Sequence, residues 1–558
     1  MFCKKKKTCP QSGDNALSVQ KDSERAVCES KRARKKRITS GAGVLAIGSV
    51  VAKMLGALYR IPLTNVLGAQ GMGMYQLIFP VYALFMVLST AGIPTALSRI
   101  VAEKRALGLD SRKFFATAMA TLAVTGGIFS ILTFALARQF AAWQGNPDTY
   151  YGFMVISPAI LLVGFISGFR GWFQGEMYMI PTAISNVVEQ VVKLALGISL
   201  ALTLVRKGLV YAVCGALAGV VVSEAVALVY MFVTYLVRSA KARRTGEYTV
   251  KERMSRDDAK SMLLIAFPIA IVAVLMPLSN FFDSVIIVNM LKIHGESLQT
   301  ATAWYGLLSG PVQSLVNMPI VAIMSIAIAI VPSVSHSNAM RDADAIMLKS
   351  RLCVKTSYLL GIPFAFFFAV FAPDLLKTVY PALSEQSLAI ASNLLRISAF
   401  NVVAYSAMQI YVSLLQALDK TKWAVLSLVC AIIVKTVLSV VLVRYIGITG
   451  GAIASLAMGA VALLGVNIAY FKICGLHLEK NVGTNLVVGV IMALSGIGVK
   501  SLLQGGAVAV AVGALVCGAI YVWFAFLFGI VGKDDIEHLP FKKLLLWLHR
   551  RIRFWEYG

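Results

Sequence analysis

Apolar stretches of about twenty residues recur along almost the whole chain, separated by short polar segments. A helix needs about 20 mainly apolar residues to cross the hydrocarbon core of a bilayer, so each stretch predicts one transmembrane helix. Fourteen spans are expected, at about 41–62, 74–98, 113–137, 150–172, 183–205, 209–236, 262–290, 303–331, 352–372, 391–416, 423–446, 449–472, 483–503 and 508–531. The pattern therefore predicts an all-α polytopic membrane protein.

The chain also repeats itself. Gln174 precedes Lys193 by 19 residues, and Gln416 precedes Lys435 by the same 19. This echo predicts two six-helix lobes arranged as a parallel repeat, plus two extra C-terminal helices, and repeat-built transporters bind their substrates near the midplane between the halves. The expected parts are a basic cytoplasmic tail at 1–39, an N-lobe at 40–237 (spans one to six), a basic cytoplasmic linker at 238–260, a C-lobe at 261–474 (spans seven to twelve), spans thirteen and fourteen at 475–532, and a basic amphipathic C-terminal tail at 533–558.

Composition agrees with this picture, since 58% of the 558 residues are hydrophobic and only 14% are charged. The net charge is +26, and the cations gather in the loops that face inside if the N-terminus does. Positive charge sorts to the cytoplasmic side, so we expect both termini in the cytoplasm. The tail 1–39 is expected to be disordered and solvated, and both tails to contact anionic lipids. We expect a monomer that binds no nucleic acid.

Cations inside the predicted spans carry most of the functional information. Lys53, Lys193 and Lys435 fall near mid-depth and Arg60 lies further out in span one. A cation in hydrocarbon costs roughly 2.5–3.5 kcal/mol on insertion scales. Either acids neutralise these residues, as Glu189 could for Lys193 four positions later, or the four cations line an aqueous cavity. Lys and Arg bind phosphate oxygens with charge-assisted hydrogen bonds, so such a cavity suits a phosphate-bearing head group.

The seventh span carries the polar residues Asn280, Asp283 and Ser284 within about one helical turn. Oxygen-bearing side chains at this spacing suit a coupling Na⁺ ion, and the acid could instead carry a proton. A salt bridge from Asp283 to Lys435 is an equally good interpretation. Arg170, near a span end, is expected to snorkel to the membrane surface.

Three segments carry a resemblance to a known family: 53–63 (Lys-Met-Leu-Gly-Ala-Leu-Tyr-Arg-Ile-Pro-Leu), 68–77 (Gly-Ala-Gln-Gly-Met-Gly-Met-Tyr-Gln-Leu) and 92–103 (Gly-Ile-Pro-Thr-Ala-Leu-Ser-Arg-Ile-Val-Ala-Glu). With them the chain resembles the stage V sporulation protein B and polysaccharide-biosynthesis membrane proteins. These are grouped with the lipid II flippases in the multidrug/oligosaccharidyl-lipid/polysaccharide exporter superfamily. The resemblance runs from about residue 40 to 531.

The resemblance implies a flippase in the bacterial cytoplasmic membrane. It would move an undecaprenyl-diphosphate-linked cell-wall or polysaccharide precursor, similar to lipid II, by alternating access. It also implies that Lys53 and Arg60 bind the head group, that spans thirteen and fourteen form a groove for the lipid tail, and that Na⁺ or the membrane potential is linked to the helix that carries Asn280 and Asp283. No other cofactor and no metal site is expected. The arginines that the other branch of lipid II flippases carries late in spans two and eight have no clear counterpart.

One other function remains open, and a further class is not expected. A cation-coupled multidrug or metabolite antiporter of the same superfamily would present acids in the cavity of its first lobe and have twelve spans. A membrane enzyme is not expected, because the five histidines lie in loops or near span ends, without a paired-carboxylate or nucleophile constellation.

Overall fold

The computed structural model describes residues 15–90, 92–107, 109–244, 256–475 and 481–532, and in these ranges the chain forms helices and no strand. The N-lobe contains α1 (Asn15–Thr90), α2 (Ile93–Ala106), α3 (Arg112–Ala135), α4 (Ala137–Trp143), α5 (Tyr150–Gly175), α6 (Ile180–Leu204) and α7 (Leu209–Arg244). The C-lobe contains α8 (Arg256–His294), α9 (Leu298–Leu307), α10 (Gln313–Ala339), α11 (Ala343–Val379), α12 (Glu385–Ser398), α13 (Asn401–Ala417), α14 (Thr421–Ile446) and α15 (Ile448–Cys474). The last hairpin is α16 (Val482–Leu502) and α17 (Gly506–Leu527).

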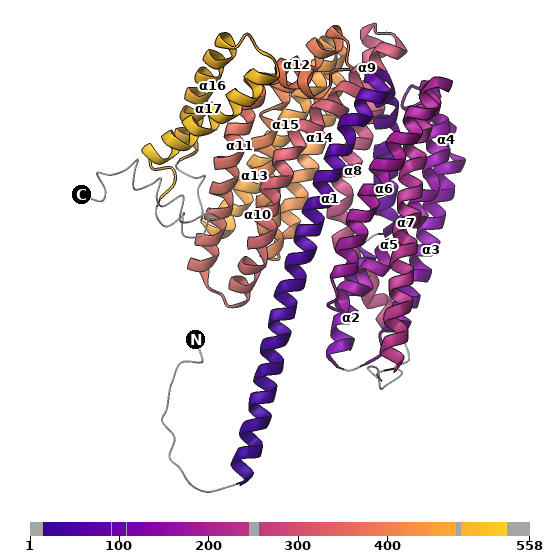
Figure 1. Cartoon of the computed structure of the whole chain (residues 1–558), viewed down its shortest axis with the longest axis vertical. Helices are drawn as coiled ribbons and strands as arrows, with labels where there is room; N and C mark the ends of the chain where they lie inside the picture. The colour runs from indigo at the N-terminus through magenta and orange to yellow at the C-terminus, as the bar shows by residue number, and fades with distance from the viewer. Residues whose placement is uncertain (1–14, 91, 108, 245–255, 476–480, 533–558) are drawn as a thin grey trace, which may run out of the picture.

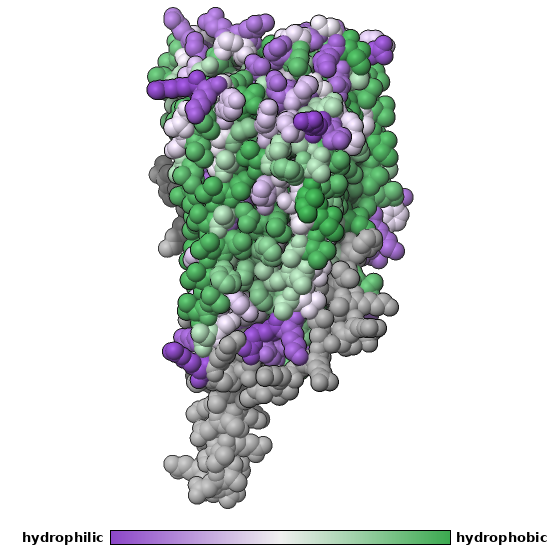
Figure 2. Space-filling view, turned by 90° about the vertical axis from the view of Figure 1, so that its right-hand side faces the viewer, coloured by the Kyte–Doolittle hydropathy of each residue, from purple (hydrophilic) through white to green (hydrophobic). Residues whose placement is uncertain are grey.

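These helices confirm the predicted fold class. Among the described residues, 12 helices are long and apolar enough to cross a membrane, or 13 if the bent pair α12–α13 counts as one span. One of them, Gly48–Ala106, is 59 residues long and covers most of the first predicted span and all of the second. The count of fourteen stays a prediction. Figure 2 shows the apolar belt on the N-lobe face, between polar surfaces at the two ends of the molecule.

The first helix differs from expectation at its beginning and bends near its middle. It begins at Asn15 rather than after a disordered tail, because residues 15–40 contain neither Gly nor Pro and are rich in helix-forming Ala, Lys and Arg. At Gly68 the backbone has φ 64° and ψ −173°, a conformation that is essentially restricted to glycine. The chain therefore reverses at Gly68, between the first two predicted spans, and α1 supplies two spans.

Each lobe has its own buried core, and Figure 1 shows them side by side with the first half of α1 between them. The N-lobe core is built around Leu63, Phe153 and Ile156, and the C-lobe core around Tyr358 and Leu395. Because a membrane offers little hydrophobic drive for helix association, close packing of small residues matters. The first half of α1 follows this rule: a Cβ at Gly48 would lie 2.7 Å from the Cβ of Ala183, so α1 packs tightly on α6.

Polar contacts join the lobes at the end that carries α9, at the top of Figure 1. The Gln76 amide donates to the carbonyl of Ser309 at 2.7 Å. The Asn146 amide donates to the Thr302 hydroxyl at 3.0 Å. This end of the interface is closed. Whether it faces outward, as the charge pattern predicts, stays a prediction.

The last hairpin packs on the outer side of the C-lobe, against α11 (Figure 1). Lys500 forms an ion pair of 2.7 Å with Asp374 of α11, and the Gly506 amide donates to the same carboxylate at 2.9 Å. The hairpin is therefore fixed to one lobe. The predicted C-terminal tail 533–558 and the centre of the predicted linker, 245–255, lie outside the described residues.

Candidate functional site

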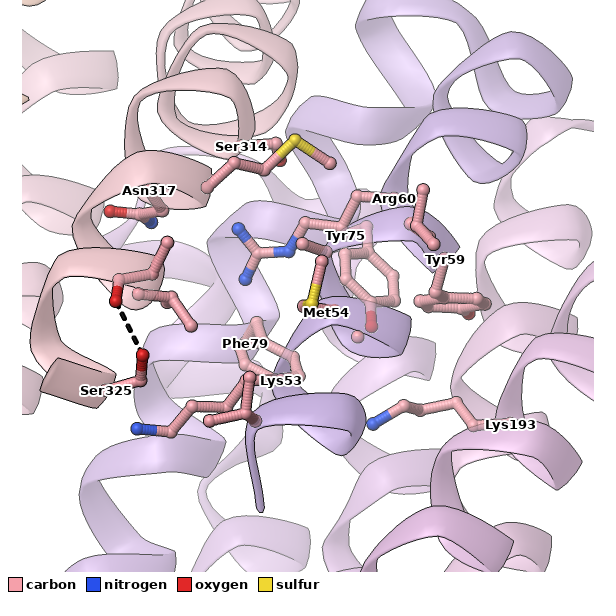
Figure 3. Close-up of a pocket in the computed structure, with 17 residues that line it drawn as sticks. Lys53, Met54, Tyr59, Arg60, Tyr75, Phe79, Lys193, Ser314, Asn317 and Ser325 are labelled. Atoms are coloured by element: carbon pink, nitrogen blue, oxygen red, sulfur yellow. Dashed lines mark hydrogen bonds between the residues drawn. The ribbon is translucent and has the colours of Figure 1, made fainter. Parts of the chain in front are cut away.

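A cavity of about 550 Å³ lies between the two lobes. The first half of α1 supplies most of its wall, α6 contributes Lys193, and α10 closes it from the C-lobe side (Figure 3). Three of the four predicted head-group residues, Lys53, Arg60 and Lys193, line it, and no acid is among its lining residues. The cavity is therefore a cationic site at the lobe interface.

The two cations of α1 project from the same side of the helix. Lys53 and Arg60 are seven residues apart, which is close to two helical turns and about 10 Å along the axis. In Figure 3 the Arg60 guanidinium is directed toward Asn317 of α10. Lys53 is exposed and Arg60 is half-buried. Neither side chain has a hydrogen bond or ion pair to any other described residue, so both are available to an anion.

Lys193 is part of a polar cluster inside the N-lobe. Its ammonium lies 3.9 Å from a carboxylate oxygen of Glu189, the partner that the four-residue spacing predicted. Arg170 of α5 contacts the other Glu189 oxygen at 2.9 Å and also donates to the hydroxyl of Ser185. The buried carboxylate of Glu224 on α7 adds to the field at Lys193. Acids inside the N-lobe therefore neutralise the charge of Lys193, and its side chain still lines the cavity.

The prediction that Arg170 snorkels is wrong. Its side chain is only 20% exposed and is held by Glu189, because a buried guanidinium is stabilised by a carboxylate within reach. The partner lies 19 residues further along the chain, on another helix, so no local spacing pointed to it. Two formal cations and two formal acids balance in this cluster, and Lys53 and Arg60 remain as uncompensated charges.

The C-lobe wall of the cavity is polar but uncharged. Ser314, Asn317 and Ser325 of α10 line it together with Met318 and Val321. The Gln313 side chain donates to the Asn317 carbonyl oxygen at 2.9 Å, which orients the amide and leaves its NH₂ group for another acceptor. One wall is thus suited to anionic oxygens and the other to neutral hydroxyl or amide groups.

The remaining predicted residues lie elsewhere. Lys435, the fourth predicted head-group cation, does not line the cavity and instead pairs with Asp283 at 2.5 Å. Asn280, Asp283 and Ser284 do not converge on one point: Asn280 is exposed, and buried Ser284 accepts a hydrogen bond from Gln144 of the N-lobe at 2.9 Å. The salt bridge that the sequence left open is the arrangement that the structure has.

Comparison with known protein families agrees with this architecture. The family model described as polysaccharide biosynthesis protein matches residues 38–338, more than half of the chain. The chain belongs to the polysaccharide biosynthesis protein family. A second model, MatE, matches residues 300–441 in the C-lobe. The resemblance inferred from the motifs around Lys53 and Gly68 is confirmed.

Two curated relatives from Bacillus subtilis (strain 168) are similar to this chain over nearly their whole length. Stage V sporulation protein B is 26% identical over 522 residues, covering 91% of this chain and 98% of the relative. Lipid II flippase MurJ is 27% identical over 538 residues, covering 90% and 98%. A solved structure of the lipid II flippase MurJ in an inward closed conformation has a TM-score of 0.67 and 13% identity over 87% of this chain and 98% of its own. The chain is a multi-span membrane protein, and these relatives carry the names of a sporulation protein and a flippase rather than of enzymes.

Proposed function

We propose that this protein is a flippase that moves an undecaprenyl-diphosphate-linked cell-wall or polysaccharide precursor across the cytoplasmic membrane by alternating access. The observation that carries the proposal is the interlobe cavity, with three cations and no acid among its lining residues. Its relatives include a protein named lipid II flippase and a stage V sporulation protein, which supports a lipid-linked cargo.

The charge of the cavity selects the cargo. Two cations without a described partner, inside an apolar belt, are costly unless an anion or water solvates them. A diphosphate brings oxygens that accept charge-assisted hydrogen bonds from both Lys53 and Arg60, and the Arg guanidinium can bind two oxygens at once. A cationic drug would meet repulsion at the same place.

The size of the cavity limits what enters it. Its 550 Å³ lies within the range of about 300–1,000 Å³ that holds a drug-sized ligand. The diphosphate and a sugar are of this scale, whereas the polyprenyl chain is apolar and remains in the lipid. We place the diphosphate against Lys53, Arg60 and Lys193 and the sugar against Asn317 and its neighbours on α10.

The membrane potential acts in the direction of export. With the cytoplasm negative, outward movement of a head group of two negative charges releases about 4–5 kcal/mol per 100 mV, at about 2.3 kcal/mol per charge. We therefore propose that the potential drives the cycle, with both chain termini in the cytoplasm.

Native mass spectrometry of the purified full-length protein tests the proposal. We expect a polyprenyl-diphosphate lipid to co-purify with the wild type and to be lost from the Lys53→Gln/Arg60→Gln variant. The matched control is Arg206→Gln/Lys207→Gln, which removes one Arg and one Lys from an exposed turn away from the cavity. Retention of the same lipid by both variants, or only phospholipids on the wild type, would count against the proposal.

A cation-coupled antiporter is the second candidate, and the MatE match at residues 300–441 favours it. Such a protein would expel cationic dyes from cells, and Asp283→Asn would reduce that efflux. Dye efflux that depends on Asp283, combined with no binding of a polyprenyl diphosphate, would select this function instead.

A further inference from the structure

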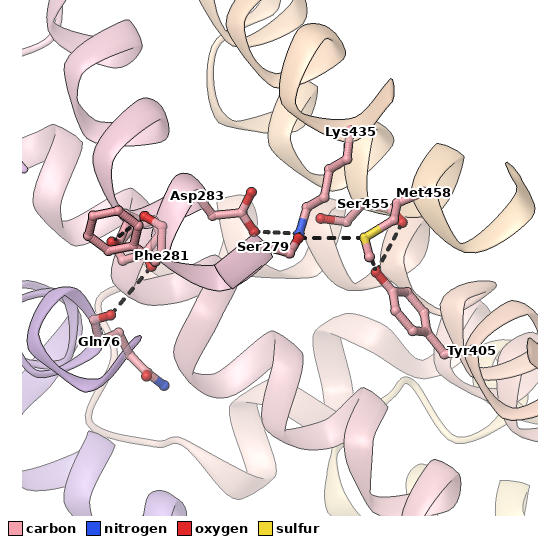
Figure 4. A network of polar contacts seen from close by, with 10 residues as sticks. Gln76, Ser279, Phe281, Asp283, Tyr405, Lys435, Ser455 and Met458 are labelled. Atoms are coloured by element: carbon pink, nitrogen blue, oxygen red, sulfur yellow. Dashed lines mark hydrogen bonds and ion pairs between the residues drawn. The ribbon is translucent and has the colours of Figure 1, made fainter. Parts of the chain in front are cut away.

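The C-lobe contains a buried charge pair that the cavity does not use. The Lys435 ammonium on α14 lies 2.5 Å from a carboxylate oxygen of Asp283 on α8, and 3.4 Å from the hydroxyl of Ser279 (Figure 4). The side chains are only 6% and 16% exposed. Tyr405 and Met458 complete the surroundings, with the tyrosine hydroxyl 3.4 Å from the methionine sulfur.

A buried carboxyl in this position is either protonated or paired with a cation, and a cation can come from two sources. One is a monovalent ion from solution, coordinated by the oxygens of Asp283 and Ser279. The other is a side chain, and Lys435 supplies it with a compact charge and three N–H donors. Both cations require the same oxygens at similar distances, so they exclude one another.

We propose that the Lys435 ammonium permanently fills a monovalent-cation site at Asp283 and Ser279, so that this lobe binds no free Na⁺. Among the described residues, the hydrogen bonds of Ser284 go to Gln144 and to the carbonyl of Phe281 rather than to the pair. The turn on α8 presents the oxygen atoms that a monovalent cation prefers, but the cation that they bind is the side chain of Lys435 on α14.

The repeat between the two lobes shows which N-lobe residue corresponds to Lys435. Lys193 on α6 and Lys435 on α14 stand at matching positions in the two lobes, each 19 residues after the corresponding glutamine. In the N-lobe this lysine lines a cavity beside cationic α1, and in the C-lobe it meets an acid on α8. The same position thus serves the cargo in one lobe and neutralises the acid in the other.

The pair also lies close to the contact between the lobes. Ser284, the residue after Asp283, accepts a hydrogen bond from Gln144 of the N-lobe at 2.9 Å. A free ion that entered and left Asp283 would change the charge on a helix that contacts both lobes, whereas a tethered ammonium keeps it constant. If the proposed function holds, flipping proceeds at the same rate with and without Na⁺.

Sodium binding to the purified protein tests the inference without any lipid substrate. The melting temperature is measured in NaCl and in choline chloride at equal ionic strength, for the wild type, Asp283→Asn, Lys435→Ala and Asp283→Asn/Lys435→Ala. We expect no Na⁺-specific shift for the wild type. In Lys435→Ala the freed carboxylate and the space left by the side chain admit Na⁺, which raises the melting temperature on the order of 2 °C or more. The double variant loses this response because the carboxylate is gone.

Two results would overturn the inference: a Na⁺-specific shift of the wild type that Asp283→Asn removes, or a folded Lys435→Ala protein that does not respond to Na⁺. If Lys435→Ala does not purify, Lys435→Ser takes its place in the same comparison, and a Na⁺-specific shift of the wild type that Asp283→Asn removes would overturn the inference without either variant. Because this assay contains no lipid-linked sugar, its failure is distinct from a failure of the proposed flippase function.

Discussion

Removing the two uncompensated cations of α1 should weaken binding of a diphosphate head group. Each charge-assisted hydrogen bond contributes about 1.5–3 kcal/mol, and every 1.4 kcal/mol is tenfold in affinity. Lys53 is exposed in the cavity, so we expect the lower value and about a tenfold loss for Lys53→Gln. Arg60 is half-buried and can bind two oxygens, so Arg60→Gln should cost about ten- to 100-fold.

The two losses should not simply add. The side chains originate about 10 Å apart along α1 and must converge on one diphosphate, so the first substitution already loosens the position of the ligand. We expect the double variant to lose at least as much affinity as Arg60→Gln alone. Affinity should also fall with rising salt, because a solvated cavity screens charges.

The assay is a titration of the detergent-purified protein with undecaprenyl diphosphate, followed by native mass spectrometry. Undecaprenyl monophosphate serves as the ligand control, and it should bind more weakly to the wild type. The protein control is Arg206→Gln/Lys207→Gln, with the same loss of charge on the exposed turn η2 (Val205–Lys207). If the cavity variants and this control bind undecaprenyl diphosphate within about twofold of each other, the reasoning from cavity charge is refuted.

Three further predictions concern other parts of the molecule. Gly68→Ala should destabilise the protein by about 1–3 kcal/mol, because the φ of 64° at this turn strains any residue with a Cβ; the melting temperature should fall well below that of Gly127→Ala, where a Cβ meets open space. Asp283→Asn should cost about 3–5 kcal/mol by leaving the Lys435 ammonium buried without its partner, and thermal unfolding of Asp283→Asn/Lys435→Met should show much of that stability restored. Asn317→Ala should weaken binding of a sugar-bearing polyprenyl diphosphate about two- to tenfold and leave binding of undecaprenyl diphosphate unchanged. Equal losses of affinity for the two lipids would show that the sugar does not bind at Asn317.

The fold could be predicted because a bilayer imposes strict rules on sequence. Each span must satisfy its backbone internally and remain apolar for about twenty residues, so hydropathy alone located the helices. A turn near Gly68 could also be expected, because three glycines lie between the first two apolar segments at residues 68–73. The bend between α12 and α13 was not predicted, because it leaves no break in hydropathy. The helix at residues 15–40 was missed because its high charge was taken to indicate a solvated tail, although its residues favour a helix.

Side chains on one helix could be placed together from the sequence, whereas contacts between two helices could not. Lys53 and Arg60 share a side of α1 through their spacing, and both line the interlobe cavity. Asn280, Asp283 and Ser284 share a turn in the same way, yet their neighbours separate them: Lys435 takes Asp283 and Gln144 takes Ser284. Partners on other helices are set by packing, and spacing within one helix does not report them.

Reconstitution into liposomes tests directly whether the protein moves a lipid-linked sugar between leaflets and whether Lys53 and Arg60 are needed for it. The purified protein is reconstituted into vesicles, and a fluorescent undecaprenyl-diphosphate-linked sugar is added to the outer leaflet. The fraction of this lipid that a membrane-impermeant quencher can reach is then followed over time. We expect fast exchange between leaflets with the wild type and the Arg206→Gln/Lys207→Gln control, and exchange close to that of protein-free vesicles with Lys53→Gln/Arg60→Gln. Exchange at the protein-free rate with the wild type, or equal exchange with all three proteins, would contradict it.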